Sequence, residues 1–419
     1  MSGFAAALLL GAMIAGVLLV VPATRRTALG PWHPAVAWIV LELVFFGVGS
    51  AGLALIDGRP GPALYVGAAV LVFGLAVAAS DRLATRRALT GQEAGQHPND
   101  PPTPIRPAVV VGLAVVGLIA LLPTLVAVGI PFLAGDITGA RSEVGGLDLQ
   151  VLRVTLPAAV LVAVIRAIRA DTRRTRLIAL CAFVVAVTAE ILLASRYLSA
   201  ELVAAIVVGV AIAGRPVSAR VLAAVALISA VLFVSVGILR AYDQAAGREF
   251  DFAVARTVNR ILLIQPRTLD ALQSAIPSEE PFFDGLTWLR RLGPVLGRDD
   301  IPNLGYWIYP RLFPDQTTPG YAAPGLLGEA WANVGWFGLA IFAVLGVVVE
   351  RLGALIARRR RETADVVAAA LATLFVARTH AVGLNGLAIL VVLVIAWRLL
   401  VAPLDGLAKD LRAAAAWRL

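Results

Sequence analysis

The feature of this sequence that most constrains its fold is a series of about eleven apolar stretches, each 15 to 25 residues long. A helix needs roughly 20 mostly apolar residues to cross about 30 Å of hydrocarbon. Inside a bilayer the backbone finds no water, so an isolated span must be helical. The predicted spans are residues 4–21, 35–55, 62–80, 108–131, 151–168, 177–194, 198–213, 221–239, 325–349, 363–377 and 384–401.

Composition excludes an ordinary soluble protein. Hydrophobic residues make up 59% of the chain and charged residues 15%, whereas soluble domains average about 45–50% and about 25%. The single cysteine, Cys181, excludes a disulfide framework. The net charge of +9 does not imply nucleic acid as a partner, because in a membrane protein basic residues report orientation. The sequence therefore predicts an all-α polytopic membrane protein.

Arginines occur in every second short loop, which predicts the orientation of the chain. Short cytoplasmic loops are enriched in Lys and Arg. We therefore expect the N-terminus outside and the C-terminus inside, and the first span is kept as a true span because no basic segment precedes it. The arginines that define the cytoplasmic side are Arg25, Arg26, Arg82, Arg86, Arg87, Arg106, Arg169, Arg173, Arg174, Arg176, Arg215, Arg220 and Arg358 to Arg361.

Two long loops divide the chain into parts. Residues 1–239 hold eight predicted spans, interrupted by a polar, Pro-rich cytoplasmic linker at 81–107. Residues 240–324 form an extracytoplasmic loop that is too long to be structureless, so we expect an ordered cap with short helices at 251–264 and 267–275. Residues 325–419 hold the last three spans and a cytoplasmic tail.

Charged residues near the predicted spans gather at their outer ends. A charge at bilayer depth costs several kcal/mol unless it is paired or hydrated, so these residues are candidates for function. Arginine captures diphosphate with two hydrogen bonds, although an arginine at a helix end also reaches lipid phosphate. Glu42, in the middle of the second span, is interpreted as a buried hydrogen-bonding residue. The outer group comprises Arg153, Glu190, Arg196, Glu201, Arg240, Glu329, Arg378 and His380.

The sharpest local pattern is PGLLGEAWANVG at 324–335. Glu329 and Asn333 lie four residues apart, so they share one face of a helix. Such a pair can bind sugar hydroxyls or hydrogen-bond a neighbouring helix, and both readings stay open. Phosphate-loop, dinucleotide, zinc-protease and paired-cysteine motifs are absent. With only three histidines on separate segments, we expect no metal site and no cofactor.

Several of these features together resemble the Wzy-type oligosaccharide repeat-unit polymerases of bacterial surface polysaccharides. The resemblance covers about residues 190–346. It rests on Ser195 and Arg196 in a turn between spans, on Arg240 at the start of the large loop, and on the loop segment PFFDGLTWLRRLGP. Its most specific part is the pattern Gly-x-x-Gly-Glu-x-x-x-Asn-x-Gly, formed by Gly325, Gly328, Glu329, Asn333 and Gly335. The chain departs from the family after Gly293, where a Pro-Arg step is missing.

The resemblance implies an inverting glycosyltransferase with a GT-C-like fold. It would join undecaprenyl diphosphate-linked oligosaccharides at the outer face of a bacterial cytoplasmic membrane. Arg196, Arg240 and Arg378 would bind the diphosphate, and Glu329 or His380 would act as the general base. Asn333, Trp288 and Asp284 are candidates for contact with the glycan. The implied partners are the lipid-linked oligosaccharide, the bilayer and a chain-length regulator, with no nucleic acid.

Three alternatives remain open from the sequence. A ligase, which passes a finished glycan to another acceptor, would use the same arginines and an outer histidine such as His380. A transporter or flippase would grip the same diphosphate, but the chain shows no duplicated halves and carries one large loop on one side. A purely structural membrane subunit is the fourth interpretation.

Overall fold

The computed structural model of the protein is helical over most of the residues it describes, with no strand among them. These residues are 2–27, 29–89, 107–131, 147–170, 172–193, 196–214, 250–292, 300–314, 320–359, 363–381 and 383–384, with single positions between 220 and 238. They form two compact units. Unit 1 comprises 1–97, 258–357 and 375–390, and unit 2 comprises 98–257, 358–374 and 391–419.

Five helical stretches among the described residues are long and apolar enough to cross a membrane. They are Ser2–Thr27, Pro34–Ile56, Gly61–Thr85, Pro107–Ala127 and Gly325–Ala357. Each overlaps a predicted span, so the membrane class read from the sequence is supported. The predicted spans at 151–168, 177–194, 198–213 and 363–377 are helical but are not among these five. Those at 221–239 and 384–401 lie almost entirely outside the described residues.

Two predicted spans are not regular α-helices. The second consists of α2 (Pro34–Glu42), a π-helical turn η2 (Leu43–Gly47) and α3 (Val48–Ile56). The ninth is divided into α14 (Gly325–Val334), the 3-10 turn η5 (Gly335–Gly338) and α15 (Leu339–Arg359). The break falls at Gly335, whose φ of 56° disfavours any residue with a Cβ. A Cβ there would also lie 2.8 Å from the Phe282 ring.

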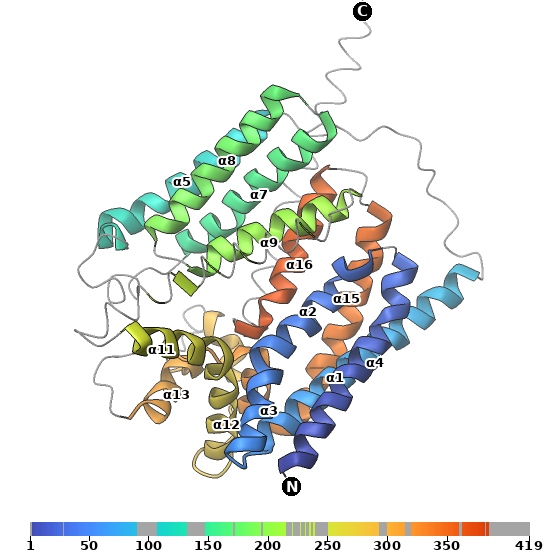
Figure 1. The fold of residues 1–419 in the computed structure, drawn as a ribbon, viewed down its shortest axis with the longest axis vertical. Helices are drawn as coiled ribbons and strands as arrows, with labels where there is room; N and C mark the ends of the chain where they lie inside the picture. The colour runs from blue at the N-terminus through green and yellow to red at the C-terminus, as the bar shows by residue number, and fades with distance from the viewer. Residues whose placement is uncertain are drawn as a thin grey trace, which may run out of the picture. The chain divides into compact units, whose positions relative to one another are not determined.

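In unit 1, helix α1 (Ser2–Thr27) packs along helix α4 (Gly61–Leu89), as Figure 1 shows. Glycines make this close approach possible. A Cβ on Gly16 would lie 2.6 Å from a Val70 methyl group, and a Cβ on Gly74 would lie 3.1 Å from the Cα of Gly16. Small residues allow helices to approach closely in a membrane, where van der Waals contact rather than water drives association.

The core of unit 1 is built around Trp38 of α2. Its ring stacks on Phe73 at a centroid distance of 4.1 Å and lies 5.9 Å from Phe342 of α15. All three side chains are fully buried. One aromatic cluster therefore connects α2, α4 and α15.

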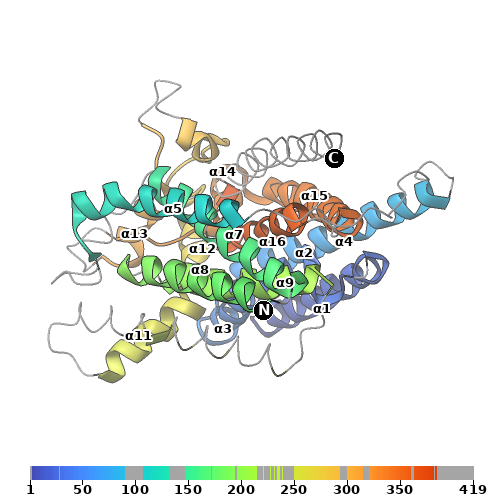
Figure 2. The same ribbon diagram turned by 90° about the horizontal axis from the view of Figure 1, so that it is seen from above.

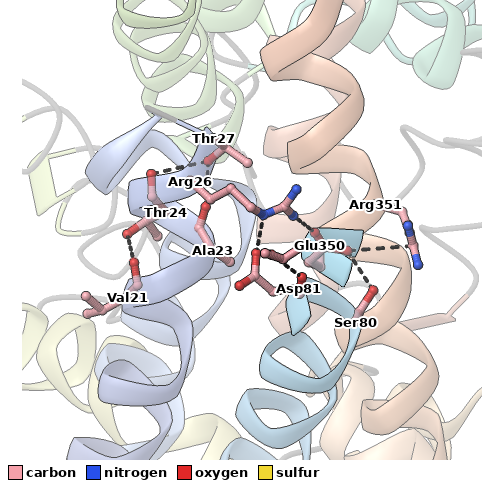
Figure 3. A network of polar contacts seen from close by, with 10 residues as sticks. Val21, Ala23, Thr24, Arg26, Thr27, Ser80, Asp81, Glu350 and Arg351 are labelled. Atoms are coloured by element: carbon pink, nitrogen blue, oxygen red, sulfur yellow. Dashed lines mark hydrogen bonds and ion pairs between the residues drawn. The ribbon is translucent and has the colours of Figure 1, made fainter. Parts of the chain in front are cut away.

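An ionic cluster with buried carboxylates and a partly exposed arginine joins three helices at one end of unit 1 (Figure 3). Arg26 of α1 is paired with Asp81 of α4 and with Glu350 of α15. Ser80 donates to the second oxygen of Glu350 at 2.6 Å. The sequence assigns Arg26, Asp81 and the end of α15 to one side of the membrane, and in the structure these helix ends meet.

The described part of the cap that belongs to unit 1 lies at the opposite end of α4. Helices α11 (Phe250–Leu262) and α12 (Ile264–Ala275) agree closely with the predicted helices at 251–264 and 267–275. Helix α13 (Leu304–Leu312) has no counterpart in the sequence-based prediction. Arg59, just before α4, pairs with Asp270 of α12. A small core, which includes Leu272, Ile308 and Ala332, connects α12 and α13 to α14.

Unit 2 contains α5 (Pro107–Val128), α7 (Leu147–Ala170), α8 (Arg173–Leu192), α9 (Arg196–Ile212) and most of α16 (Thr363–Ala377). Helix α7 packs against α5, α8 and α9, as Figure 1 and Figure 2 show. Thr172 and Thr175 form a capping box at the start of α8, which satisfies backbone N–H groups at that helix end.

The glycine contact between α1 and α4 gives a direct test of this packing. We expect Gly16→Leu to destabilise the protein by about 1–3 kcal/mol, because the added side chain meets Val70 in a filled interface. Gly11→Leu is the matched control, since a Cβ on Gly11 meets nothing within 4 Å. Thermal unfolding in detergent measures both variants. Equal midpoints for Gly16→Leu and Gly11→Leu would contradict the interface.

Candidate functional site

The candidate site is built on Glu329, in the second turn of α14. Its side chain is buried, with 7% exposed. One carboxylate oxygen, Oε2, accepts a hydrogen bond from the backbone N–H of Leu384 at 2.8 Å. A Cβ on Gly383, whose φ is 63°, would lie 2.2 Å from the carboxylate. Only glycine at position 383 therefore lets the chain wrap around the Glu329 carboxylate.

Arg378 and His380 lie in the turn that follows α16 and precedes Gly383. The turn is closed by the N–H of Ala381, which donates to the carbonyl oxygen of Arg378 at 2.9 Å. A Cβ on Gly325, at the start of α14, would lie 2.2 Å from the carbonyl oxygen of His380. The structure thus brings the predicted residues Glu329, Arg378 and His380 together at one location in unit 1.

The surroundings of His380 differ from those expected. Its side chain is 3% exposed and stacks on Phe45 at a centroid distance of 4.3 Å. Its Nδ1 lies 2.6 Å from the carbonyl oxygen of Ala377, which can only accept, so Nδ1 carries the proton. Burial lowers the pKa of His380 to about 4. Its ring is therefore neutral at physiological pH, unlike a histidine with the ordinary pKa near 6.5 that suits a general base.

The second predicted span forms one wall of the site. Trp38 donates from Nε1 to the hydroxyl of Thr379 at 3.1 Å, and the Phe46 ring lies beside Gly325. Glu42 lies one helical turn from Trp38 and one from Phe46, and it is fully buried. No group among the described residues donates a hydrogen bond to its two carboxylate oxygens, which contradicts the prediction of a hydrogen-bonded Glu42.

Gln265 is a site residue that the sequence analysis missed. It lies in the first turn of α12 and donates from Nε2 to the carbonyl oxygen of His380 at 3.0 Å. Phe45, which supports the His380 ring, was missed as well. Neither residue belongs to a recognisable motif. The π-helical turn that orients Phe45 is also not encoded in a simple apolar periodicity.

Asn333 has a different role from the one predicted. Its amide Nδ2 donates to the Thr287 hydroxyl at 2.6 Å and to the Glu329 carbonyl oxygen at 2.7 Å. The side chain is fully buried. Asn333 therefore holds the 282–288 loop against α14, and its predicted contact with the glycan does not fit this arrangement.

The 282–288 loop carries the other two predicted glycan contacts. The backbone N–H of Asp284 donates to the Asn333 carbonyl oxygen at 3.0 Å, and its side chain is exposed. Trp288 is half-buried, and its indole Nε1–H is enclosed without a hydrogen-bond acceptor. The structure thus brings together the two segments that carry most of the resemblance, residues 282–288 and 325–335.

The structure does not show where Arg196 and Arg240, the other two predicted diphosphate ligands, lie relative to Glu329. Arg196 is the first residue of α9 in unit 2, and its side chain lies outside the described part of the structure, as does all of Arg240. Within the described residues, no three His, Cys, Asp or Glu side chains are grouped as metal ligands would be.

Comparisons of this chain with protein-family models, with curated proteins and with solved structures give no match.

The burial of His33 and His380 predicts how the stability of the protein depends on pH. Burial, together with the nearby Arg26 charge, lowers the pKa of His33 to about 4, as burial does for His380. Because both histidines bind protons more tightly when unfolded, stability falls as pH drops from about 6.5 towards 4, by at most about 1.4 kcal/mol per pH unit for each. Thermal unfolding between pH 7.5 and 5 measures this slope. His380→Gln should reduce the slope, and a slope equal to that of the wild type would contradict the buried neutral ring.

Proposed function

We propose that the protein is a polysaccharide polymerase, an inverting glycosyltransferase that joins undecaprenyl diphosphate-linked oligosaccharide repeat units. The reaction takes place at the outer face of a bacterial cytoplasmic membrane. The proposal includes the eleven-span, GT-C-like organisation and the orientation read from the loops. Its sequence support is the resemblance over residues 190–346.

The observation that carries the proposal is the grouping of Glu329, Arg378 and His380 around the start of α14. A carboxylate and a guanidinium, each at least nine-tenths buried, lie on two segments in contact. This grouping is found at the cap end of α4, opposite the Arg26 cluster that the sequence assigns to the cytoplasm. Transfer from an exported lipid-linked sugar needs its polar groups on that outer side.

The proposed reaction needs one proton acceptor and one cation. The Glu329 carboxylate takes the proton from the acceptor sugar hydroxyl as its oxygen attacks the anomeric carbon of the donor sugar. The bond between that carbon and the diphosphate oxygen breaks, and the lipid diphosphate leaves with the electron pair. Arg378 stabilises the charge that develops on this leaving group, with Arg196 and Arg240 as the further diphosphate ligands.

Of the two candidate bases, Glu329 is favoured over His380. The His380 ring is 3% exposed and stacked on Phe45, and its Nδ1 already donates to the carbonyl oxygen of Ala377. A carboxylate offers about four acceptor sites on its two oxygens, and Oε2 of Glu329 accepts the Leu384 N–H. His380 instead helps to hold the turn that carries Arg378.

Chain elongation in liposomes tests the proposal. Purified protein is incubated with the undecaprenyl diphosphate-linked repeat unit of its own pathway, and gel analysis reports glycan length. We expect a ladder from the wild type and a rate reduced about 100-fold or more in Glu329→Gln, because general base catalysis contributes at least that factor. The matched control is Glu279→Gln, an exposed acid of the cap, which should elongate normally.

The other outcomes separate the alternatives. Transfer of a single block without a ladder identifies a ligase. Absence of transfer by the wild type with the correct donor rejects glycosyl transfer and favours a transporter. A normal ladder from Glu329→Gln contradicts the role of Glu329 as the base.

A further inference from the structure

The cap presents a pair of exposed aromatic rings beside the candidate site. Tyr306 of α13 and Tyr321, which precedes α14, are 49% and 46% exposed. Their ring centroids lie 5.3 Å apart and their planes meet at 70°, an edge-to-face pair. Each ring combines an apolar face with a hydroxyl group that both donates and accepts hydrogen bonds.

Two glycines pack against tyrosine rings at this surface. Gly305 lies against Tyr321 of the pair, and Gly320 lies against the nearby Tyr309. A Cβ on Gly305 would lie 2.0 Å from the Tyr321 ring, and a Cβ on Gly320 would lie 2.0 Å from the Tyr309 ring. The N–H of Ala322 also donates to the carbonyl oxygen of Gly305 at 3.1 Å. The backbone at Gly305 is therefore hydrogen-bonded to the backbone at Ala322. The Tyr321 ring packs on Gly305, where any side chain would displace it. A ring held in advance loses little conformational freedom when a ligand binds.

The neighbourhood of the pair is charged, which favours water over lipid hydrocarbon. On the same short helix, Arg311 stacks over the Trp307 ring at 3.9 Å from its centroid. Arg311 also lies 3.7 Å from a carboxylate oxygen of Glu279 and 3.9 Å from one of Glu280, and all three side chains are substantially exposed. An exposed tyrosine pair offers apolar ring faces and polar hydroxyls together, which suits an amphipathic ligand.

The chain connects this surface to Glu329 over a short distance. From Tyr321 to Gly325 an extended chain spans at most about 14 Å, and from Gly325 to Glu329 one helical turn adds about 6 Å. Ala322 is buried in the small core that joins α13 to α14, so the two features are also packed together. The separation is within the length of a short oligosaccharide.

We propose that Tyr306 and Tyr321 form a carbohydrate platform on which one sugar ring of the oligosaccharide packs while another ring reaches Glu329. This proposal rests on the proposed function and adds a subsite to it. The C–H face of a pyranose is weakly apolar and packs on an aromatic ring, while its hydroxyls reach the tyrosine hydroxyls. The platform gives the enzyme a way to recognise a repeat unit at a sugar remote from the bond being formed.

Isothermal titration of the full-length protein in detergent tests the platform. The probe is the lipid-free repeat-unit oligosaccharide, released by mild acid from the lipid-linked intermediate. We expect Tyr306→Ala and Tyr321→Ala each to raise Kd about three- to tenfold, the range that a lost aromatic contact gives. Tyr306→Phe, which keeps the ring but loses the hydroxyl, should raise Kd less than Tyr306→Ala. The control Phe337→Ala removes an exposed ring outside the pair, 86% exposed, and should leave Kd unchanged.

The same variants in the elongation assay separate this proposal from the proposed function. The platform predicts a higher KM at unchanged kcat for Tyr321→Ala. Equal Kd values in all variants, or no binding by the wild type, would overturn the platform even if the protein elongates chains. Platform-dependent binding by a protein that transfers no sugar would reject the polymerase and retain the carbohydrate site.

Discussion

The free-energy cost of a charge in hydrocarbon determines how this protein is organised. Unit 1 holds its ion pairs at its two ends. At one end Arg26 joins Asp81 and Glu350, and at the other Arg59 joins Asp270 of the cap. Between them the core around Trp38 is mainly apolar and aromatic, and the fully buried Glu42 lies one helical turn from Trp38. Because α4 runs from one ionic end to the other, its apolar length sets the distance between the predicted cytoplasmic face and the cap.

The fold was predictable where a single physical rule dominates. Apolar length identified the five membrane-crossing stretches, and amphipathic spacing found α11 and α12 within a few residues. Neither apolar length nor amphipathic spacing predicted the backbone geometry where contacts distant in sequence determine it. The π-helical turn at Leu43–Gly47 packs Phe45 on His380, and the break at Gly335 accommodates the Phe282 ring. Both contacts join residues separated by at least 50 positions, which no local pattern reports.

The sequence selected some residues of the candidate site but not their surroundings. A polar residue near the outer end of a span is expensive, which drew attention to Glu329, Arg378 and His380, and the structure brings these three to one location. Their roles depend on neighbours. Asn333 is saturated by Thr287 and Glu329, and His380 is neutral because it is buried and bonded to Ala377. Gly383 is essential to the Glu329 environment, yet a lone glycine in an apolar segment carries no functional signal in sequence.

The central claim is that the Glu329 end of unit 1 faces outward and the Arg26 end faces the cytoplasm. Thiol labelling of intact spheroplasts tests it most directly, in a background where the exposed Cys181 is replaced by alanine. A membrane-impermeant maleimide should label Ser278→Cys in the cap from outside. It should label Thr85→Cys, close to Asp81, only after lysis. Labelling of Thr85→Cys in intact spheroplasts, with Ser278→Cys protected until lysis, would contradict the account.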